Sequence, residues 1–478
     1  MDRIEVEVAI IGAGSAGMRA YREASSVTDR VLLIEGGPYG TTCARVGCMP
    51  SKLLIAAAEA AHAGPHAARF GVNYPAPQVD GRAVMDRVRA ERDRFVGFVV
   101  EAVEAWPERH RAKAWARFTS DHELALSDGR TVRAERIVIA TGSRPNIPKP
   151  FEAFGDRLIV NDDVFAWETL PGSAVVFGAG VIGLELGQSL HRLGVRTALF
   201  GRDNLVGPLT DPQVLKTARG IFTEEFEFHP HGEVTRMART EAGVAIDYTE
   251  DGATKTAEFD YALVATGRRP NVDGIGLETT SIELDDRGIP VYDLHTGRCG
   301  QSHVFIAGDV NNRLPLLHEA ADEGMAAGYN AARFPEIRRF AKSSPITVMF
   351  SDPQIMMVGE SHRELAQRGA DFAIGEIDWS DQGRARVMGI NAGLLRVYGE
   401  RNTGLFLGAE GIGPRAEHIA HLLAWSHQSR LTVSEMLARP FYHPVFEEGL
   451  RTALRSLNAA LEMGPRFPAR CLDCGPGA

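Results

Sequence analysis

The chain has 478 residues, too many for one hydrophobic core, so we expect about three or four domains. Its formal net charge of −10 gives no reason to expect nucleic acid or an anionic membrane surface as a partner. The sequence lacks a run of 18 apolar residues and an apolar strand begins close to residue 1, so we expect a cytoplasmic protein without a membrane span or a signal peptide.

The first motif is a glycine loop between an apolar strand, residues 5–11, and a helix. Glycines at such a loop let the backbone approach a pyrophosphate, whose charge the helix N-terminus favours. The next apolar strand, residues 31–34, ends in Glu35, where a carboxylate can accept a hydrogen bond from an adenosine ribose. Strand, loop, helix and acid together predict a dinucleotide site. Its glycines are Gly12, Gly14 and Gly17.

The second motif is a pair of cysteines, Cys43 and Cys48. Five residues of undistorted helix correspond to about 140° of rotation and roughly 7.5 Å of rise, too far for a disulfide, so the segment must bend. We expect Gly47 to allow the bend through a backbone angle that other residues avoid, and Pro50 to occupy the first position of the following helix. Cys48 would then lie at a helix N-terminus, where the peptide dipoles favour a thiolate. Because the chain has only five cysteines, this pair indicates catalysis rather than a secreted disulfide framework.

After a long surface helix, predicted over residues 82–106, the nucleotide-binding pattern repeats. Strand 174–177 runs into a second glycine loop, and Ala-Thr-Gly-x-Arg-Pro-Asn occurs twice, at residues 140–146 and 265–271. The glycines of the second loop are Gly178, Gly180 and Gly183. The repeat indicates an internal duplication of a nucleotide-binding unit, so two dinucleotides are implied.

A candidate base lies near the C-terminal end. Thiol-disulfide exchange needs a group that takes a proton from the attacking thiol. His443 precedes Pro444, which is expected to hold it out of helical geometry and to begin the helix that carries Glu448. The Glu448 carboxylate can then return to the imidazole and fix its tautomer.

These segments, above all Cys-x4-Cys followed by Met-Pro-Ser-Lys, resemble the pyridine nucleotide-disulfide oxidoreductases, with the closest overall similarity to dihydrolipoamide dehydrogenase. The resemblance covers nearly the whole chain. It implies an α/β fold with two Rossmann-like domains, for FAD and for NAD(P), and an α+β dimerisation domain. The implied ranges are 1–149 and 274–342 for the FAD part, 150–273 for the NAD(P) part, 343–465 for dimerisation, and 466–478 for a flexible tail.

The resemblance also implies a role for each candidate site residue. Cys48 lies against the flavin, Cys43 exchanges with the disulfide substrate, and Lys52 tunes the flavin with Glu185 as its partner. The remaining cofactor contacts are Asp309 on the ribitol, Leu317 and His318 at the flavin, and Val234 and Gly267 at the nicotinamide nucleotide. His443 and Glu448 reach the cysteines of the other subunit, so activity requires a homodimer. The candidate residues include no metal ligand set.

The choice of nicotinamide is open. In NAD-specific relatives the second strand of the nicotinamide unit ends in an acid, but here strand 197–200 is followed by Gly201 and Arg202. Arginine pairs with a phosphate dianion through two parallel hydrogen bonds, which favours NADPH or a relaxed choice. Asp203 could still supply the missing carboxylate.

The sequence therefore predicts electron transfer between NAD(P)H and a disulfide or dithiol, the substrate being a small disulfide or a lipoyl-carrying protein. One alternative is an NADPH-dependent reductase of protein disulfides or mercuric ion that uses a second pair, Cys471 and Cys474; that pair could equally be idle or bind metal adventitiously. An alternative of another class is a flavin-binding redox sensor. Cys299 is expected to be a small packing residue.

Overall fold

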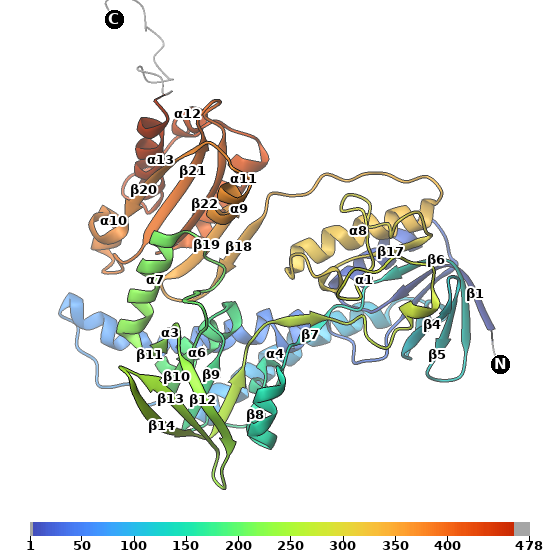
Figure 1. Cartoon of the computed structure of the whole chain (residues 1–478), viewed down its shortest axis with the longest axis horizontal. Helices are drawn as coiled ribbons and strands as arrows, with labels where there is room; N and C mark the ends of the chain where they lie inside the picture. Colours follow the sequence, from blue (N-terminus) through green and yellow to red (C-terminus); the bar gives the residue numbers. More distant parts are fainter. Residues whose placement is uncertain (1–2, 463–478) are drawn as a thin grey trace, which may run out of the picture.

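The computed structural model describes residues 3–462, and its larger sheets lie in three separate regions (Figure 1). The first sheet, at the right of Figure 1, has the order β3-β2-β1-β6-β5-β4, with β17 also paired to β6. Its strands are β1 (Arg3–Ile11), β2 (Val31–Ile34), β3 (Arg111–Ala112), β4 (Ala116–Ser120), β5 (Glu123–Leu126), β6 (Thr131–Ile139) and β17 (Val304–Ile306). Strand β17 pairs in parallel with β6 although 165 residues separate Val304 from Ile139, so the last strand completes a sheet begun at the N-terminus.

Two helices pack closely on one another against this sheet. They are α1 (Ser15–Ser25) and α8 (Leu317–Arg333). A Cβ at Gly324 would lie 2.2 Å from the Ala16 carbonyl oxygen, and one at Gly328 would lie 2.4 Å from that of Ala20. Glycine is therefore required on α8, because the two helix backbones nearly touch.

The second sheet has the order β11-β10-β9-β15-β8, and all its strands are parallel. They are β8 (Leu158–Ile159), β9 (Ser173–Phe177), β10 (Arg196–Phe200), β11 (Glu227–His229) and β15 (Tyr261–Val264). The helices of this region are α5 (Asn161–Val164), α6 (Val181–Arg192) and α7 (Pro212–Glu225). A separate antiparallel sheet lies beside it and consists of β12 (Glu233–Arg239), β13 (Val244–Glu250) and β14 (Ala253–Phe259). Every residue of β9 is buried, as expected for a central parallel strand.

The two copies of the repeated motif meet each other. Strand β7 (Ser143–Pro145) pairs antiparallel with β16 (Arg268–Pro270). The bonds are reciprocal: the Asn146 N–H donates to the Gly267 carbonyl and the Asn271 N–H donates to the Gly142 carbonyl, both at 2.9 Å. This reciprocal pairing brings together the two copies of the motif that the sequence repeats.

The third sheet is antiparallel, in the order β18-β19-β22-β21-β20, and lies at the upper left of Figure 1. Its strands are β18 (Ile346–Met349), β19 (Gln354–Gly359), β20 (Phe372–Asp378), β21 (Leu394–Glu400) and β22 (Phe406–Gly413); its helices are α9 (His362–Gln367), α10 (Gly383–Val387), α11 (Ala416–Gln428), α12 (Val433–Leu437) and α13 (Glu447–Leu461). Leu450, Leu454, Leu457 and Leu461 recur at helical spacing on α13 and are buried. This apolar stripe explains why the last helix packs on the sheet.

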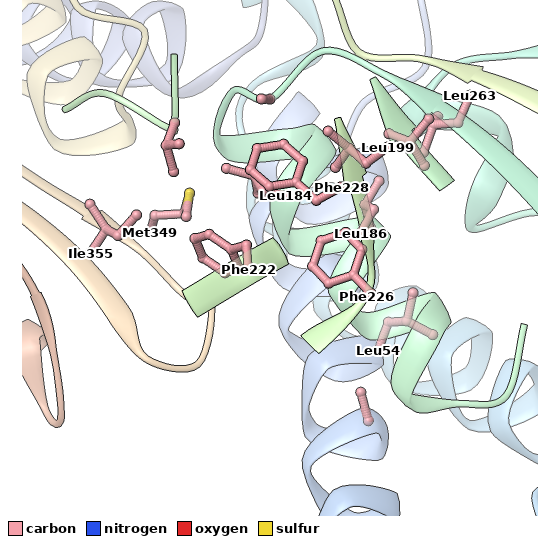
Figure 2. Close-up of a cluster of buried hydrophobic side chains, with 14 of the residues drawn as sticks. Leu54, Leu184, Leu186, Leu199, Phe222, Phe226, Phe228, Leu263, Met349 and Ile355 are labelled. Carbon is pink, nitrogen blue, oxygen red and sulfur yellow. The ribbon is translucent and has the colours of Figure 1, made fainter. Parts of the chain in front are cut away.

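The remaining helices, α2 (Thr42–Val46), α3 (Cys48–Ala67) and α4 (Gly81–Glu104), follow β2. Figure 2 shows Leu54 of α3 in one apolar cluster with Leu184 and Leu186 of α6 and with Met349 of β18. The helix that begins at Cys48 is thus fixed by a core shared with the second sheet and the third.

Candidate active site

Cys43 and Cys48 lie on either side of a break between two helices. Cys43 is in α2, α2 ends at Val46, and Cys48 is the first residue of α3. Pro50 was predicted to start this helix, which is wrong by two residues. Gly47 has φ −125° and ψ −119°, and a Cβ there would lie 3.0 Å from the Thr42 carbonyl oxygen. Glycine allows the two helices, and so the two sulfurs, to approach.

The two thiols differ in their electrostatics. The pKa of Cys48 is lowered to about 6, first by a hydrogen bond from Cys43 and then by the charge of Lys52, against the opposing effect of burial. The pKa of Cys43 is raised, first by the same hydrogen bond and then by burial. At neutral pH the reduced pair is therefore a Cys48 thiolate that accepts from a Cys43 thiol.

Lys52, one turn after Cys48, forms an ion pair with Glu185 of α6, with 2.7 Å between Nζ and Oε2. Glu185 is only 4 % exposed, and its other oxygen accepts the Phe350 N–H at 2.8 Å. The Phe350 ring lies 4.6 Å from Lys52 Nζ. The Lys52–Glu185 contact was predicted; Phe350 was missed, because nothing in its local sequence marks it as a neighbour of residues so distant in the chain.

The first glycine loop has the shape of a pyrophosphate cradle. Gly12 has φ +106°, and a Cβ at Gly17 would lie 1.8 Å from the Gly12 carbonyl oxygen, so this turn needs both glycines. A Cβ at Gly14 meets nothing within 4 Å, which leaves space at the N-terminus of α1. Glu35 accepts the Ala13 and Gly37 N–H groups, each at 2.7 Å, so its carboxylate sits at the same end of the loop. These residues fit the pyrophosphate and adenosine ribose of a dinucleotide.

The second loop repeats this geometry. Gly178 has φ +111°, a Cβ at Gly183 would lie 1.9 Å from the Gly178 carbonyl oxygen, and a Cβ at Gly180 again meets open space. Gly267, also at positive φ (+105°), follows β15 and its Cβ position is likewise open. Val234 lies half-buried on β12 against the aromatic cluster around Phe200.

No acid ends β10, whose last residue is Phe200. The Arg202 side chain is 90 % exposed and its Nε donates to Asp203 at 2.9 Å. The arginine and the carboxylate that the sequence offered as alternatives are therefore paired with each other, beside the second loop.

The residues expected at the flavin lie after β17 and at the start of α8. Asp309 follows β17 and accepts the Ser143 hydroxyl at 2.9 Å, and Arg268 donates to that hydroxyl at 2.9 Å. Leu317 and His318 are exposed at the start of α8. Ser143 was missed, although it occupies in the first motif copy the position that Arg268 occupies in the second.

His443 and Glu448 contact each other in the third region. His443 Nδ1 lies 3.0 and 2.9 Å from the two Glu448 carboxylate oxygens, and this hydrogen bond lowers the pKa of Glu448. Pro444 was predicted to begin the helix, which is wrong, since α13 begins at Glu447. Within residues 3–462 no hydrogen bond or ion pair joins this dyad to the cysteine segment, and His443 is 79 % exposed.

Two other findings concern the described part of the chain. Over residues 3–462, His, Cys, Asp and Glu side chains do not gather in any group of three that could hold a metal ion, and none of the helices there is long and apolar enough to cross a membrane.

Cys299 is buried in the first region's core, as predicted, and burial raises its pKa to about 12. Cys471 and Cys474 lie outside the described residues.

Two dinucleotide cradles, a pair of cysteines at a helix start and a histidine-glutamate dyad beside a third sheet define a flavin-dependent disulfide oxidoreductase. The family described as pyridine nucleotide-disulphide oxidoreductase matches residues 6–324, and its dimerisation domain matches residues 345–454. The chain belongs to this family. It is an oxidoreductase that uses FAD and NAD(P) to act on sulfur groups, and its dimerisation domain supports a homodimer.

Similar proteins cover nearly its full length. A dihydrolipoyl dehydrogenase from Halobacterium salinarum is 30 % identical over 456 residues, which cover 94 % of this chain and 95 % of the relative. One from Geobacillus stearothermophilus is 28 % identical over 93 % of this chain and 94 % of the relative. Among solved structures, a Cu(II) complex of the HOCl-induced flavoprotein disulfide reductase RclA from Escherichia coli aligns with a TM-score of 0.79 at 21 % identity, over 95 % of this chain and 99 % of that one. LpdA from Mycobacterium tuberculosis aligns with the same TM-score at 23 % identity and the same coverage.

Proposed function

We propose that this chain is a dihydrolipoamide dehydrogenase-like enzyme in which Cys43 and Cys48 exchange electrons with a small disulfide or a lipoyl group. The observation that carries this assignment is the placement of Cys43 and Cys48 on either side of the break between α2 and α3, with Lys52 one turn after Cys48. A hydrogen bond from Cys43 and the Lys52 charge lower the pKa of Cys48, which a structural pair would not require but an exchange reaction uses.

The residues of the chain account for each bond and for the first of the two protons. His443 takes the proton of the Cys43 thiol, whose raised pKa keeps it protonated until a base acts. The Cys43 sulfur attacks the substrate disulfide, the substrate S–S bond breaks, and the leaving thiolate receives the proton from His443. Cys48 then attacks Cys43, which closes the Cys43–Cys48 disulfide and releases the second substrate sulfur as a thiolate that takes its proton from solvent. The overall change is one substrate disulfide reduced to two thiols and one enzyme dithiol oxidised to a disulfide.

When bound, FAD supplies the two-electron step that returns the enzyme disulfide to the dithiol at the expense of NAD(P)H. Gly12, Gly14, Gly17 and Glu35 would hold its phosphates and adenosine ribose. Asp309, Leu317 and His318 would line the ring and ribitol, with Lys52 held beside them by Glu185.

We infer that the active site is shared between two subunits. The His443–Glu448 dyad makes no bond to the cysteines of its own chain within the described residues, and its exposed imidazole is free to meet the cysteines of a second copy. The family's dimerisation domain covers residues 345–454, which include this dyad.

The lipoyl assignment follows the relatives, which are named dihydrolipoyl dehydrogenase. We propose NADPH or relaxed nicotinamide use, on the basis of Arg202 beside the second loop, and a cytoplasmic location, because a cycling dithiol needs a reducing compartment.

An NADPH-dependent reductase of protein disulfides or mercuric ion remains the second candidate and depends on Cys471 and Cys474. A redox sensor without turnover is disfavoured because both cysteines and the His443–Glu448 dyad are present.

The test is a set of initial rates with NADH and NADPH against lipoamide, glutathione disulfide, thioredoxin and mercuric ion, for the wild type and for Cys43→Ser. We expect lipoamide to be the best acceptor and Cys43→Ser to lose turnover of every disulfide. Cys299→Ala is the matched control, since this buried cysteine should leave the rates unchanged. Full disulfide turnover by Cys43→Ser would contradict the assignment, and a preference for thioredoxin or mercuric ion would favour the second candidate.

A further inference from the structure

A buried glutamine supports the turn between His443 and Glu448. Gln382 is 7 % exposed and precedes α10, where its Oε1 accepts the Ala385 N–H at 2.7 Å. Its Nε2 donates to the Val445 carbonyl at 2.9 Å, across 63 residues of sequence. One side chain therefore caps its own helix and holds the turn that carries the dyad.

The same turn is held from its other side. The Val445 N–H donates to Glu448 Oε2 at 3.3 Å, and this carboxylate also accepts from His443. Thus both polar backbone groups of Val445 are bonded: its carbonyl accepts from Gln382, and its N–H donates to Glu448.

The start of α13 packs against Trp379, three residues before Gln382 in the sequence. A Cβ at Gly449 would lie 2.5 Å from the Trp379 ring, and Trp379 is itself buried. Glu448 directly precedes Gly449. The packing of Gly449 on Trp379 therefore fixes the position of Glu448, and the bond from Gln382 to Val445 fixes the path of the turn before it.

We propose that Gln382 is a positioning residue for the His443–Glu448 base, an inference that rests on the role of His443 given above. Among residues 3–462 the hydrogen bonds of the His443 ring go to Glu448 alone, and the ring is otherwise largely exposed. Its direction therefore depends on the turn and on Glu448, both of which Gln382 fixes through Val445.

Two substitutions separate this role from the capping role. Gln382→Asn keeps a favourable N-cap carboxamide for α10 but is one methylene too short to reach Val445. Gln382→Glu keeps the length and the acceptor for Ala385 but, when ionised, has no hydrogen to donate to Val445. Gln354→Asn is the matched control, because Gln354 Oε1 accepts the Glu417 N–H at α11 and has no bond to the dyad.

The experiment uses the holoenzyme, reduced with NADH or NADPH, and measures the rate at which iodoacetamide alkylates Cys43 between pH 6 and 9, together with kcat and KM for lipoamide. We expect both Gln382 variants to lower kcat and the alkylation rate near pH 7 about tenfold, the effect of one lost hydrogen bond, with little change in KM and in the rate of enzyme reduction by nicotinamide. Gln354→Asn should match the wild type.

A double-mutant cycle with Glu448→Gln distinguishes positioning from a general loss of structure. We expect Gln382→Asn to change the rates of Glu448→Gln by less than about twofold, because the group it positions is already impaired. Wild-type rates for Gln382→Asn, or a full tenfold loss added to that of Glu448→Gln, would overturn the inference. If His443→Ala itself kept wild-type rates, the proposed role of the base would fail first, and the two failures would be distinguishable.

Discussion

Removing the Cys43 sulfur should make the Cys48 thiolate harder to form. The hydrogen bond from Cys43 is the largest cause of the lowered Cys48 pKa, and Lys52 contributes less. Cys43→Ala removes the donor, whereas Cys43→Ser keeps an O–H in nearly the same place. The two variants also leave Cys48 as the single thiol of the pair, so its ionisation can be followed alone.

The magnitude follows from the strength of a hydrogen bond to a charged group, about 1.5–3 kcal/mol. At about 1.36 kcal/mol for each pKa unit, loss of the donor corresponds to about one to two units. Although burial opposes the lowered pKa, solvent still reaches Cys48 in the described chain and screens the hydrogen bond, which places the effect at the lower end. The Cys48 pKa, about 6 in the intact pair, is therefore expected near 7 or above in Cys43→Ala and close to its original value in Cys43→Ser.

The assay is the pH dependence of iodoacetamide alkylation, in a background where Cys471 and Cys474 are serine. Cys299 should not interfere, because it is buried and its pKa is about 12. The reaction rate rises as the thiolate forms, so its midpoint reports the Cys48 pKa. Equal midpoints in the alanine and serine variants would refute the assignment of the lowered pKa to the Cys43 hydrogen bond.

Three further predictions use other parts of the fold. Gly14→Val should reduce FAD retention at least tenfold with little change in the thermal midpoint of the apoprotein, since its side chain enters the open cradle; an unchanged rate of flavin release on dilution would argue against that site. Arg202→Ala should raise KM for NADPH about tenfold and leave KM for NADH within about twofold, and equal effects on both would remove the case for phosphate recognition. Burial lowers the pKa of His303, so the folded protein favours the neutral imidazole. The stability that this provides is present above the unfolded pKa of about 6.5 and is lost as the pH falls through the lower folded pKa. His303→Gln should therefore narrow the difference in thermal midpoint between pH 7.5 and pH 5, and an undiminished difference would contradict this.

Local chemistry could be predicted from the sequence because its determinants are neighbours in the chain. Both glycine loops, Glu35 and the Cys43–Cys48 break follow from residues that are a few positions apart, and the structure places them as expected. The details of helix starts were less accurate. Proline is compatible with several positions in a first turn, so neither Pro50 nor Pro444 could fix where its helix begins.

Contacts between distant segments needed either the family resemblance or the structure. The pairing of Lys52 with Glu185, 133 residues apart, came from the resemblance and is present at 2.7 Å. Phe350 and Gln382 have no motif that marks them, because their roles depend on how the third sheet packs against α3 and on how α10 meets the last turn. A sequence pattern reports the period and the composition of one element, and it carries little information about which distant carbonyl that element will meet.

The most direct test of the account is to reduce the purified flavoprotein with one equivalent of NADH or NADPH and to measure both iodoacetamide-reactive thiols and long-wavelength absorbance, in the wild type and in Cys48→Ser. We expect the wild type to gain two reactive active-site thiols and an absorbance band from the Cys48 thiolate beside oxidised flavin, and the variant to show neither the band nor disulfide turnover. A polypeptide that takes up no flavin, or a Cys48→Ser enzyme that reduces disulfides as fast as the wild type, would contradict the central claim.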